Sequence, residues 1–290
     1  MLRLFARLVL LGLLAAGAAL WLTRATPVDG ARFAELTPDA GNGAQVFFAG
    51  GCASCHKAKD SDDPSILPGG QRFVTAFGTF IAPNISPDPI YGLGEWTLGD
   101  FGSAVLNGTS PDGRHYYPAF PYTTYTRMTD QDVVDLWAYM QTLPSSDIAS
   151  LDHEVGFPFN IRASLGPWKV LFLNKDWVQP AETPEEQRGR YLVEALGHCA
   201  ECHTARNLLG GIDRANWMNG APNPSGKGRI PAITPAHLDW SGPDITYYLE
   251  TGFTPDFDSA GGEMVDVIEN MARLTPEDRA AIAAYVKALN

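Results

Sequence analysis

A five-residue pattern, Cys-x-x-Cys-His, occurs twice in this chain of 290 residues, as CASCH at 52–56 and as CAECH at 199–203. The two copies contain all four cysteines of the sequence. This spacing is typical of covalent haem attachment, in which two thiols bond to the porphyrin edge and the adjacent histidine ligates the iron. The residues predicted to hold two haem c groups in this way are Cys52, Cys55, His56, Cys199, Cys202 and His203.

Two other uses of paired cysteines fit the sequence less well. A thioredoxin-like redox pair requires a strand-to-helix context, which surrounds neither Gly51 nor His198. A tetrahedral zinc site could use two cysteine pairs, but it does not require a histidine directly after the second cysteine of both. Haem attachment explains more of the pattern, because it leaves no cysteine unassigned.

The first 25 residues predict a membrane anchor or a signal. An apolar run at 8–22 follows Arg3 and Arg7 and ends before Arg24. As a helix this run would be about 22 Å long, or about 28 Å if it began at Leu4, which is close to the roughly 30 Å of membrane hydrocarbon. The run is therefore just long enough to span a bilayer.

A cleaved signal peptide is the competing interpretation of this segment. The sequence Ala-Gly-Ala at 16–18 has the small-x-small form of a cleavage site. A cut there would leave the apolar sequence 19–22 at the new N-terminus, which favours an uncleaved anchor. In both cases the body is exported, and the positive-inside rule places residues after Arg24 on the periplasmic side of a bacterial inner membrane.

The charge of the chain limits its partners. The formal net charge is −12, and the first 24 residues carry three arginines and no acids, so the remainder carries −15. An acidic surface of this kind argues against nucleic-acid binding and favours redox proteins that present a basic docking patch. Solubility alone would also account for most of these charges.

The repeat extends beyond the cysteines. The haem motifs lie 147 residues apart, and at the nearly equal offset of 146 the segment 128–132 aligns with 274–278. Both segments predict a helix start, because Thr129 and Thr275 are good N-caps, and an acid three residues later, Asp132 or Asp278, is placed to complete a capping box. Apolar residues then follow at helical spacing, at Val133, Leu136, Trp137 and Met140 and again at Ile282, Tyr285, Val286 and Leu289. The two halves are predicted to be copies of one unit.

With a helix, a Cys-x-x-Cys-His motif, long loops and a capped final helix in each half, the chain resembles class I cytochrome c domains in tandem. More narrowly, it resembles the cytochrome c subunits of bacterial membrane-bound alcohol and gluconate dehydrogenases, and related dihaem cytochromes. Those dehydrogenase subunits carry three haems, whereas this chain has two motifs. The resemblance covers about residues 38–290 and is carried by PNISP at 83–87, YPAFPY at 117–122 with Met128, FPFNIR at 157–162 and GRYL at 189–192.

The resemblance implies methionine as the sixth ligand of each iron, opposite histidine, which raises the reduction potential. In the second half, the Gly-Gly-x-Met pattern of this group falls on 261–264, so Met264 is the predicted ligand. Met271, seven residues further on, could reach the same haem if the loop ran differently, and is assigned to packing. The proximal histidines are expected to donate their other N–H to a backbone carbonyl, with Pro68 and the loop near Leu209 as candidates.

The first half departs from the pattern. The related subunits have methionine where this chain has Phe120, which cannot bind iron. Met128 is the predicted replacement, because members of the group with phenylalanine at the earlier site commonly have methionine at the later one. Met128 aligns with Leu274, so a role in the core alone is its alternative. A bis-histidine site using His115 and an iron without a sixth ligand also stay open.

The predicted fold is all-α, with two tandem class I cytochrome c domains behind an N-terminal transmembrane helix. The predicted segments are an anchor or signal at 1–25, domain 1 at 38–146, a linker at 147–183 and domain 2 at 184–290. The linker contains Trp168 and Trp177 and is expected to pack across the domain junction, since a long structureless loop would be unusual.

The predicted function is electron transfer rather than catalysis. Such a dihaem cytochrome, anchored in the bacterial inner membrane with its haem domains in the periplasm, would carry single electrons from a donor dehydrogenase or respiratory complex to an acceptor. One alternative is a cytochrome subunit fixed within a membrane-bound dehydrogenase or oxidase complex. The other is a peroxidase-like dihaem enzyme, which the replacement at Phe120 leaves open.

Overall fold

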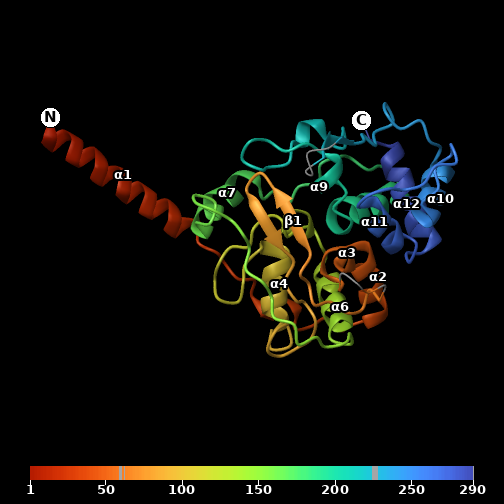
Figure 1. The fold of residues 1–290 in the computed structure, drawn as a ribbon, viewed down its shortest axis with the longest axis horizontal. Coiled ribbons are helices and arrows are strands. Elements are labelled where there is room, and N and C mark those ends of the chain that lie inside the picture. The colour runs from red at the N-terminus through yellow and green to blue at the C-terminus, as the bar shows by residue number, and fades with distance from the viewer. Residues whose placement is uncertain (59–60, 62, 224–227, 290) are drawn as a thin grey trace.

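The computed structural model describes residues 1–58, 61, 63–223 and 228–289. Its longest helix, α1 (Leu2–Leu22), extends away from a body that contains the other elements (Figure 1). The stretch 3–22 is long and apolar enough to cross a membrane, and none of it is buried against the body. An N-terminal signal sequence would have the same properties.

The first half of the body is mostly helical. Its helices surround one core, and a short antiparallel hairpin, in which Arg72 pairs with Ile81, lies against the linker. The elements are η1 (Gly30–Phe33), α2 (Ala40–Ala49), α3 (Cys52–His56), β1 (Arg72–Thr75), β2 (Gly78–Ile81), α4 (Leu98–Asn107), α5 (Tyr122–Tyr125) and α6 (Asp130–Met140).

The second half repeats this order. It also contains a short hairpin, in which Ala221 pairs with Ile230, so within the described residues two small antiparallel sheets accompany the helices. The elements are α8 (Pro184–Tyr191), η3 (Leu192–Leu196), α9 (Ala200–His203), η4 (Arg214–Asn216), β3 (Ala221–Pro222), β4 (Arg229–Ile230), α10 (Gly242–Thr251), α11 (Met264–Met271) and α12 (Pro276–Lys287).

One helix crossing occurs in both halves. In the first half, α2 packs against α6, and a Cβ at Gly43 would lie 2.0 Å from the carbonyl oxygen of Asp135. In the second half, α8 packs against α12, and a Cβ at Gly189 would lie 1.9 Å from the carbonyl oxygen of Ala281. Glycine is required at both positions because the backbones touch. These pairs obey the 146-residue offset, which supports the prediction of two copies.

The predicted N-caps form, but the second half of each capping box does not. The hydroxyls of Thr129 and Thr275 accept hydrogen bonds from the backbone N–H groups of Asp132 and Asp278, as expected. The two carboxylates do not return to the cap residues. They accept hydrogen bonds from polar groups at the domain junction instead.

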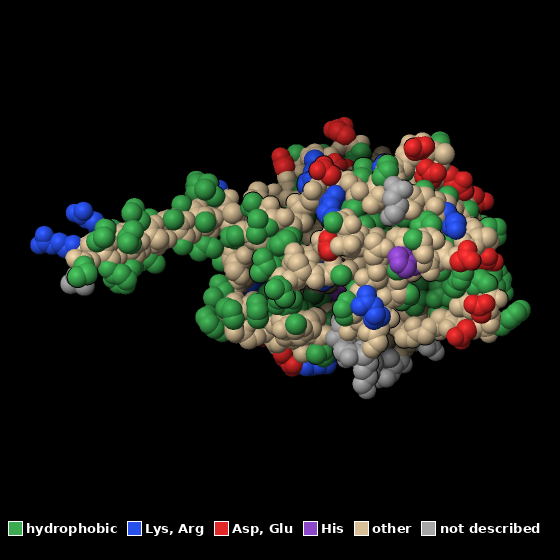
Figure 2. Space-filling model, turned by 90° about the horizontal axis from the view of Figure 1, so that it is seen from above, with side chains coloured by type: hydrophobic (Ala, Val, Ile, Leu, Met, Phe, Trp, Pro, Cys, Tyr) green, Lys and Arg blue, Asp and Glu red, His purple; other side chains and the backbone are tan. Residues whose placement is uncertain are grey.

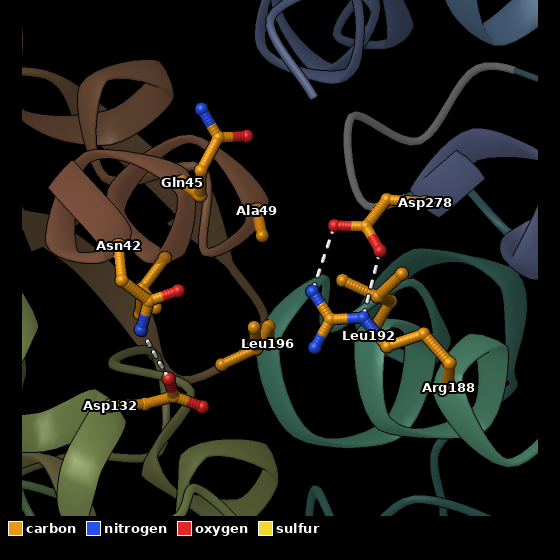
Figure 3. Close-up of a pocket in the computed structure, with 9 residues that line it drawn as sticks. Asn42, Gln45, Ala49, Asp132, Arg188, Leu192, Leu196 and Asp278 are labelled. Carbon is orange, nitrogen blue, oxygen red and sulfur yellow. Dashed lines mark hydrogen bonds and ion pairs between the residues drawn. The ribbon is translucent and has the colours of Figure 1, made fainter. Parts of the chain in front are cut away.

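Equivalent faces of the two domains meet at the junction. Asn42 donates to Asp132 at 2.9 Å, and Arg188 makes two hydrogen bonds to Asp278 at 2.7 and 2.8 Å (Figure 3). Position 188 is the repeat partner of 42, and 278 is the partner of 132. Ala49 and Leu196 lie between these two pairs. The domains therefore meet about an approximate two-fold axis, as the subunits of a symmetric dimer do.

The linker contacts both domains, as expected. It contains η2 (Arg162–Ser164) and α7 (Leu165–Phe172). The Arg127 side chain of domain 1 donates to the backbone carbonyls of Asn174 and Asp176. The indole N–H of Trp168 donates to the carbonyl of Leu209 in domain 2 at 2.8 Å. These contacts make the linker part of the packed body.

Candidate dihaem site

Each Cys-x-x-Cys-His segment begins after a residue in the left-handed region. Gly51 has φ +61° directly before Cys52, and His198 has φ +39° directly before Cys199. The turn reverses the chain after α2 and η3 and starts the short helices α3 and α9, which carry the second cysteine and the histidine. Glycine adopts this conformation without strain, whereas His198 is held in it by its packing at the junction.

Both motif histidines are oriented by a proline carbonyl. Nδ1 of His56 lies 2.8 Å from the carbonyl oxygen of Pro83, and Nδ1 of His203 lies 2.8 Å from that of Pro231. Nδ1 must therefore carry the proton, and neither Nε2 has a hydrogen-bond partner among the described residues. The expectation of a backbone carbonyl is confirmed, but the candidates Pro68 and the loop near Leu209 were wrong.

The chemistry of these side chains suits iron ligation by histidine. Burial lowers the pKa of His56, and the hydrogen bond to Pro83 offsets part of that shift. Burial also lowers the pKa of His203, and the hydrogen bond to the Pro231 carbonyl offsets part of that shift. Both imidazoles are therefore neutral at pH 7, with a lone pair on Nε2 available to a metal.

The cysteines do not have the character of a redox pair or of a zinc site. Burial raises the pKa of Cys52 and that of Cys199 to about 12, whereas the attacking cysteine of a redox pair has a lowered pKa. Within the described residues, no cluster of three or more histidines, cysteines and acids suits a metal ion. Covalent haem attachment is the use of the motifs that agrees with both observations.

The predicted methionine ligands lie in different settings. Met128 is buried and follows α5, and its backbone N–H donates a hydrogen bond to the backbone carbonyl of Tyr125. Met264 is half-buried at the first position of α11, and Met271 is buried at the end of that helix, in agreement with a packing role. Phe120 packs its ring edge-on against three tyrosine rings, those of Tyr116, Tyr122 and Tyr125.

His115 is engaged elsewhere. Its Nε2 lies 3.1 Å from the carbonyl oxygen of Thr23, at the end of α1. Its own carbonyl accepts a hydrogen bond from Arg162 of the linker. A histidine that joins α1 to the linker in this way is a poorer candidate for the sixth ligand than Met128, which lies in the core of domain 1.

The two attachment segments meet at the junction. Nε2 of His198, next to Cys199, lies 3.2 Å from the carbonyl oxygen of Gly50, two residues before Cys52. The Tyr125 hydroxyl donates to the same carbonyl at 2.8 Å, and its ring packs edge-on against His198. The histidine is therefore a hydrogen-bonded junction residue rather than a ligand.

Domain 1 also contacts the helix that carries Met264. The Lys57 ammonium, directly after His56, lies 3.0 Å from Asp266 and 3.3 Å from Glu269 of α11. The side chain of Asn270 donates to the Ser54 hydroxyl at 2.9 Å. The first attachment helix and the proposed ligand segment of the second domain are thus packed together.

The sequence could have shown that two residues of the site are equivalent, though not what their carbonyls bind, and it gives no signal for a third. Pro83 and Pro231 each stand two residues before an isoleucine, at an offset of 148, which an alignment of the halves would have shown. Glu194 has no such signal, because its repeat position is Phe48. It is buried and accepts hydrogen bonds from the N–H groups of the linker and from Tyr285 of α12.

Comparison with known proteins agrees with this geometry. A family model described as Cytochrome c matches residues 40–144 and again residues 186–290. A Diheme cytochrome c-type protein of Cereibacter sphaeroides is 55% identical over 278 residues, covering 95% of this chain and 94% of the relative. The chain belongs to the cytochrome c family. It carries two covalently bound haem c groups.

Other relatives are subunits of dehydrogenases. The Fructose dehydrogenase cytochrome subunit of Gluconobacter japonicus is 36% identical over 275 residues, covering 92% of this chain and 56% of the relative. The Gluconate 2-dehydrogenase cytochrome c subunit of Pantoea cypripedii is 34% identical over 278 residues, covering 89% of this chain and 62% of the relative. The chain thus spans less than two thirds of these subunits.

Proposed function

We propose that this chain is a membrane-anchored, periplasmic electron carrier that passes single electrons between a donor dehydrogenase or respiratory complex and an acceptor. Cys52, Cys55, Cys199 and Cys202 would hold the two haems, with His56 and His203 as proximal ligands and Met128 and Met264 as sixth ligands. The haem groups supply one-electron chemistry when bound. The anchor would be α1.

The observation that carries this proposal is the matched pair of oriented histidines. In both halves a proline carbonyl holds Nδ1–H, so Nε2 is the atom left to bind iron. A half-buried, neutral imidazole held in this way would need little rearrangement when a bound iron gained or lost an electron, which suits electron transfer. Among the residues that the structure describes, neither histidine has an acidic or basic side chain as a hydrogen-bond partner, as proton-coupled catalysis would require.

The contact between the attachment segments supports a two-haem carrier. A hydrogen bond between His198 and the Gly50 carbonyl joins the two segments directly, and the Lys57 ammonium forms an ion pair with Asp266 of α11. Acidic side chains gather on the end of the body farther from α1 (Figure 2). A redox partner with a basic patch would dock at that end, and salt would weaken this association.

The test is the identity of the sixth ligands in the holoprotein. Ferric haem with a methionine ligand has a weak absorption band in the red, and both domains should contribute to it. Met128→Ala should remove about half of this band and Met264→Ala the other half. Met271→Leu, which alters another buried methionine of domain 2, is the matched control and should leave the band intact.

The outcomes separate the functions. An unchanged band in Met128→Ala would remove Met128 from the ligand set, and a high-spin first haem in the native protein would favour the peroxidase-like enzyme. A spectroelectrochemical titration should then show two one-electron steps in the wild-type protein. Failure to observe both steps would contradict the carrier proposal.

A second candidate is a subunit fixed within a dehydrogenase or oxidase complex. The relatives named as cytochrome subunits of fructose and gluconate dehydrogenases favour it. Purification from native membranes distinguishes the two candidates. A carrier should separate from its donor at moderate salt, whereas a fixed subunit should co-purify in constant stoichiometry with a dehydrogenase.

A further inference from the structure

A group of exposed apolar side chains lies in the linker beside the base of α1. Their exposed fractions range from 45% to 81%, although nearby side chains of the same types are buried. Figure 2 shows hydrophobic side chains gathered on the body around that base. We call this group the apolar collar, and its members are Phe157, Phe159, Ile161, Val170 and Leu171.

Specific contacts hold the collar at the base of α1. A Cβ at Gly166 of α7 would lie 2.3 Å from the carbonyl oxygen of Thr23, so α7 and the end of α1 touch through backbone. His115 binds the same carbonyl and, through its own carbonyl, Arg162. The Tyr117 hydroxyl donates to the carbonyl of Phe159 at 3.1 Å. The collar is therefore fixed relative to α1.

Two cations that lie between Ile161 and Val170 in the sequence turn inward. The Lys169 ammonium binds the carbonyls of Asn107 and Gly108 at 2.6 and 2.8 Å. The Arg162 guanidinium stacks over the Tyr117 ring at 4.6 Å. Both cations are thus bound to the body, whereas the apolar side chains just before Arg162 and just after Lys169 are exposed.

The charge of this segment differs from that of the chain. The body is strongly acidic, yet residues 155–175 contain no aspartate or glutamate and three cations. Two of these cations are turned inward, but Lys175 is exposed. The surface of the segment therefore presents apolar side chains, one exposed basic residue and no acids, which is complementary to an anionic lipid interface. Trp21 near the end of α1, with Arg24 over its ring, has the composition of a membrane-interface anchor.

We propose that the apolar collar inserts into the interfacial region of the bilayer that α1 spans. This proposal rests on the assignment of α1 as an anchor, not on the identity of the haem ligands. It gives the body one orientation, with the linker against the lipid and the acidic end of domain 2 directed away from it. A second attachment point of this kind would present that end to soluble redox partners.

The experiment uses the full-length holoprotein with a protease site inserted between Ala25 and Thr26, reconstituted into vesicles of pure anionic lipid. After cleavage, flotation and haem absorbance measure how much of the body stays on the vesicles. The wild-type body should stay. Val170→Ser combined with Leu171→Ser should lower its partition coefficient by at least about tenfold, because several methylene groups lose their apolar environment.

The matched control is Phe257→Ser, which removes a side chain that is 98% exposed in domain 2. It should leave the partition unchanged, and the haem spectra of all variants should match the wild type, since the substituted residues are exposed. Release of the wild-type body, or equal retention of the collar variant, would overturn the proposal. So would release from pure lipid with retention on native membranes, which would indicate a protein partner.

Flotation before cleavage separates the two assumptions. If the uncut chain floats and the cut body does not, α1 is the anchor and the collar proposal is wrong. An uncut chain that stayed in solution would overturn the span and the collar together. Neither result bears on the proposed haem ligands, which the spectra test independently.

Discussion

Gly43→Ala should destabilise domain 1 by forcing apart the helices that position its haem motif. The new Cβ would lie 2.0 Å from the Asp135 carbonyl oxygen, against about 3.4 Å for ordinary contact, so α2 and α6 must separate by about 1.4 Å. Overpacking of this kind costs up to about 3 kcal/mol, and the better helix propensity of alanine returns about 1 kcal/mol. The net loss is about 2 kcal/mol.

Calorimetry of the holoprotein measures this effect. A loss of about 2 kcal/mol should lower the melting temperature of a domain of this size by about 10 °C. The haem spectrum of domain 1 should also change, because α2 leads into the attachment helix α3. Gly189→Ala should produce the corresponding loss in domain 2, where the distance is 1.9 Å.

The matched control is Gly41→Ala in the same helix. Its Cβ would lie 3.1 Å from a side-chain oxygen of Asp39 and near no other group outside the helix. This variant should be neutral or slightly stabilising, because alanine has the higher helix propensity and its Cβ would contact no backbone atom outside the helix. Equal melting temperatures for Gly41→Ala and Gly43→Ala would refute the close helix crossing.

Three further outcomes are expected. Met264→Ala should lower the reduction potential of one haem and leave that of the other unchanged, as potentiometry would show; a shift in both would mean that the domains are not independent. Glu194→Leu should cost about 3–5 kcal/mol in denaturant unfolding, because it leaves the Val178 N–H and the Tyr285 hydroxyl without their buried acceptor, whereas Glu194→Gln should cost less. Burial lowers the pKa of Lys169 to about 8, so the folded chain loses this proton first and the free energy of unfolding should rise between about pH 8 and 10.5. Lys169→Met should remove that slope, and a slope that persisted would assign it to another group.

Local patterns in the sequence predicted the parts of this protein that depend on near neighbours. The spacing within Cys-x-x-Cys-His predicts haem attachment because the chemistry occurs within five residues. The threonine caps at Thr129 and Thr275 formed where expected, and the apolar residues behind them lie in the core or pack against it. The comparisons confirmed the tandem cytochrome c domains and the two haem groups.

Prediction failed where a residue serves two purposes. Asp132 and Asp278 were expected to complete capping boxes, yet they bind Tyr191, Asn42 and Arg188 across or beside the junction. The sequence pattern of a capping box is the same whether the carboxylate binds the cap residue or a group at the junction. Only the position of the other domain decides which partner it binds.

The sequence by itself determined the repeat, the attachment chemistry and the segments that pair within each half, since these follow from spacing and from helical periodicity. The tertiary structure decided how the halves face each other, which carbonyls orient His56 and His203, and where the collar lies relative to α1. These features depend on backbone atoms brought together from distant positions. Every residue supplies a carbonyl group, so the identity of the residue says little about which one is used.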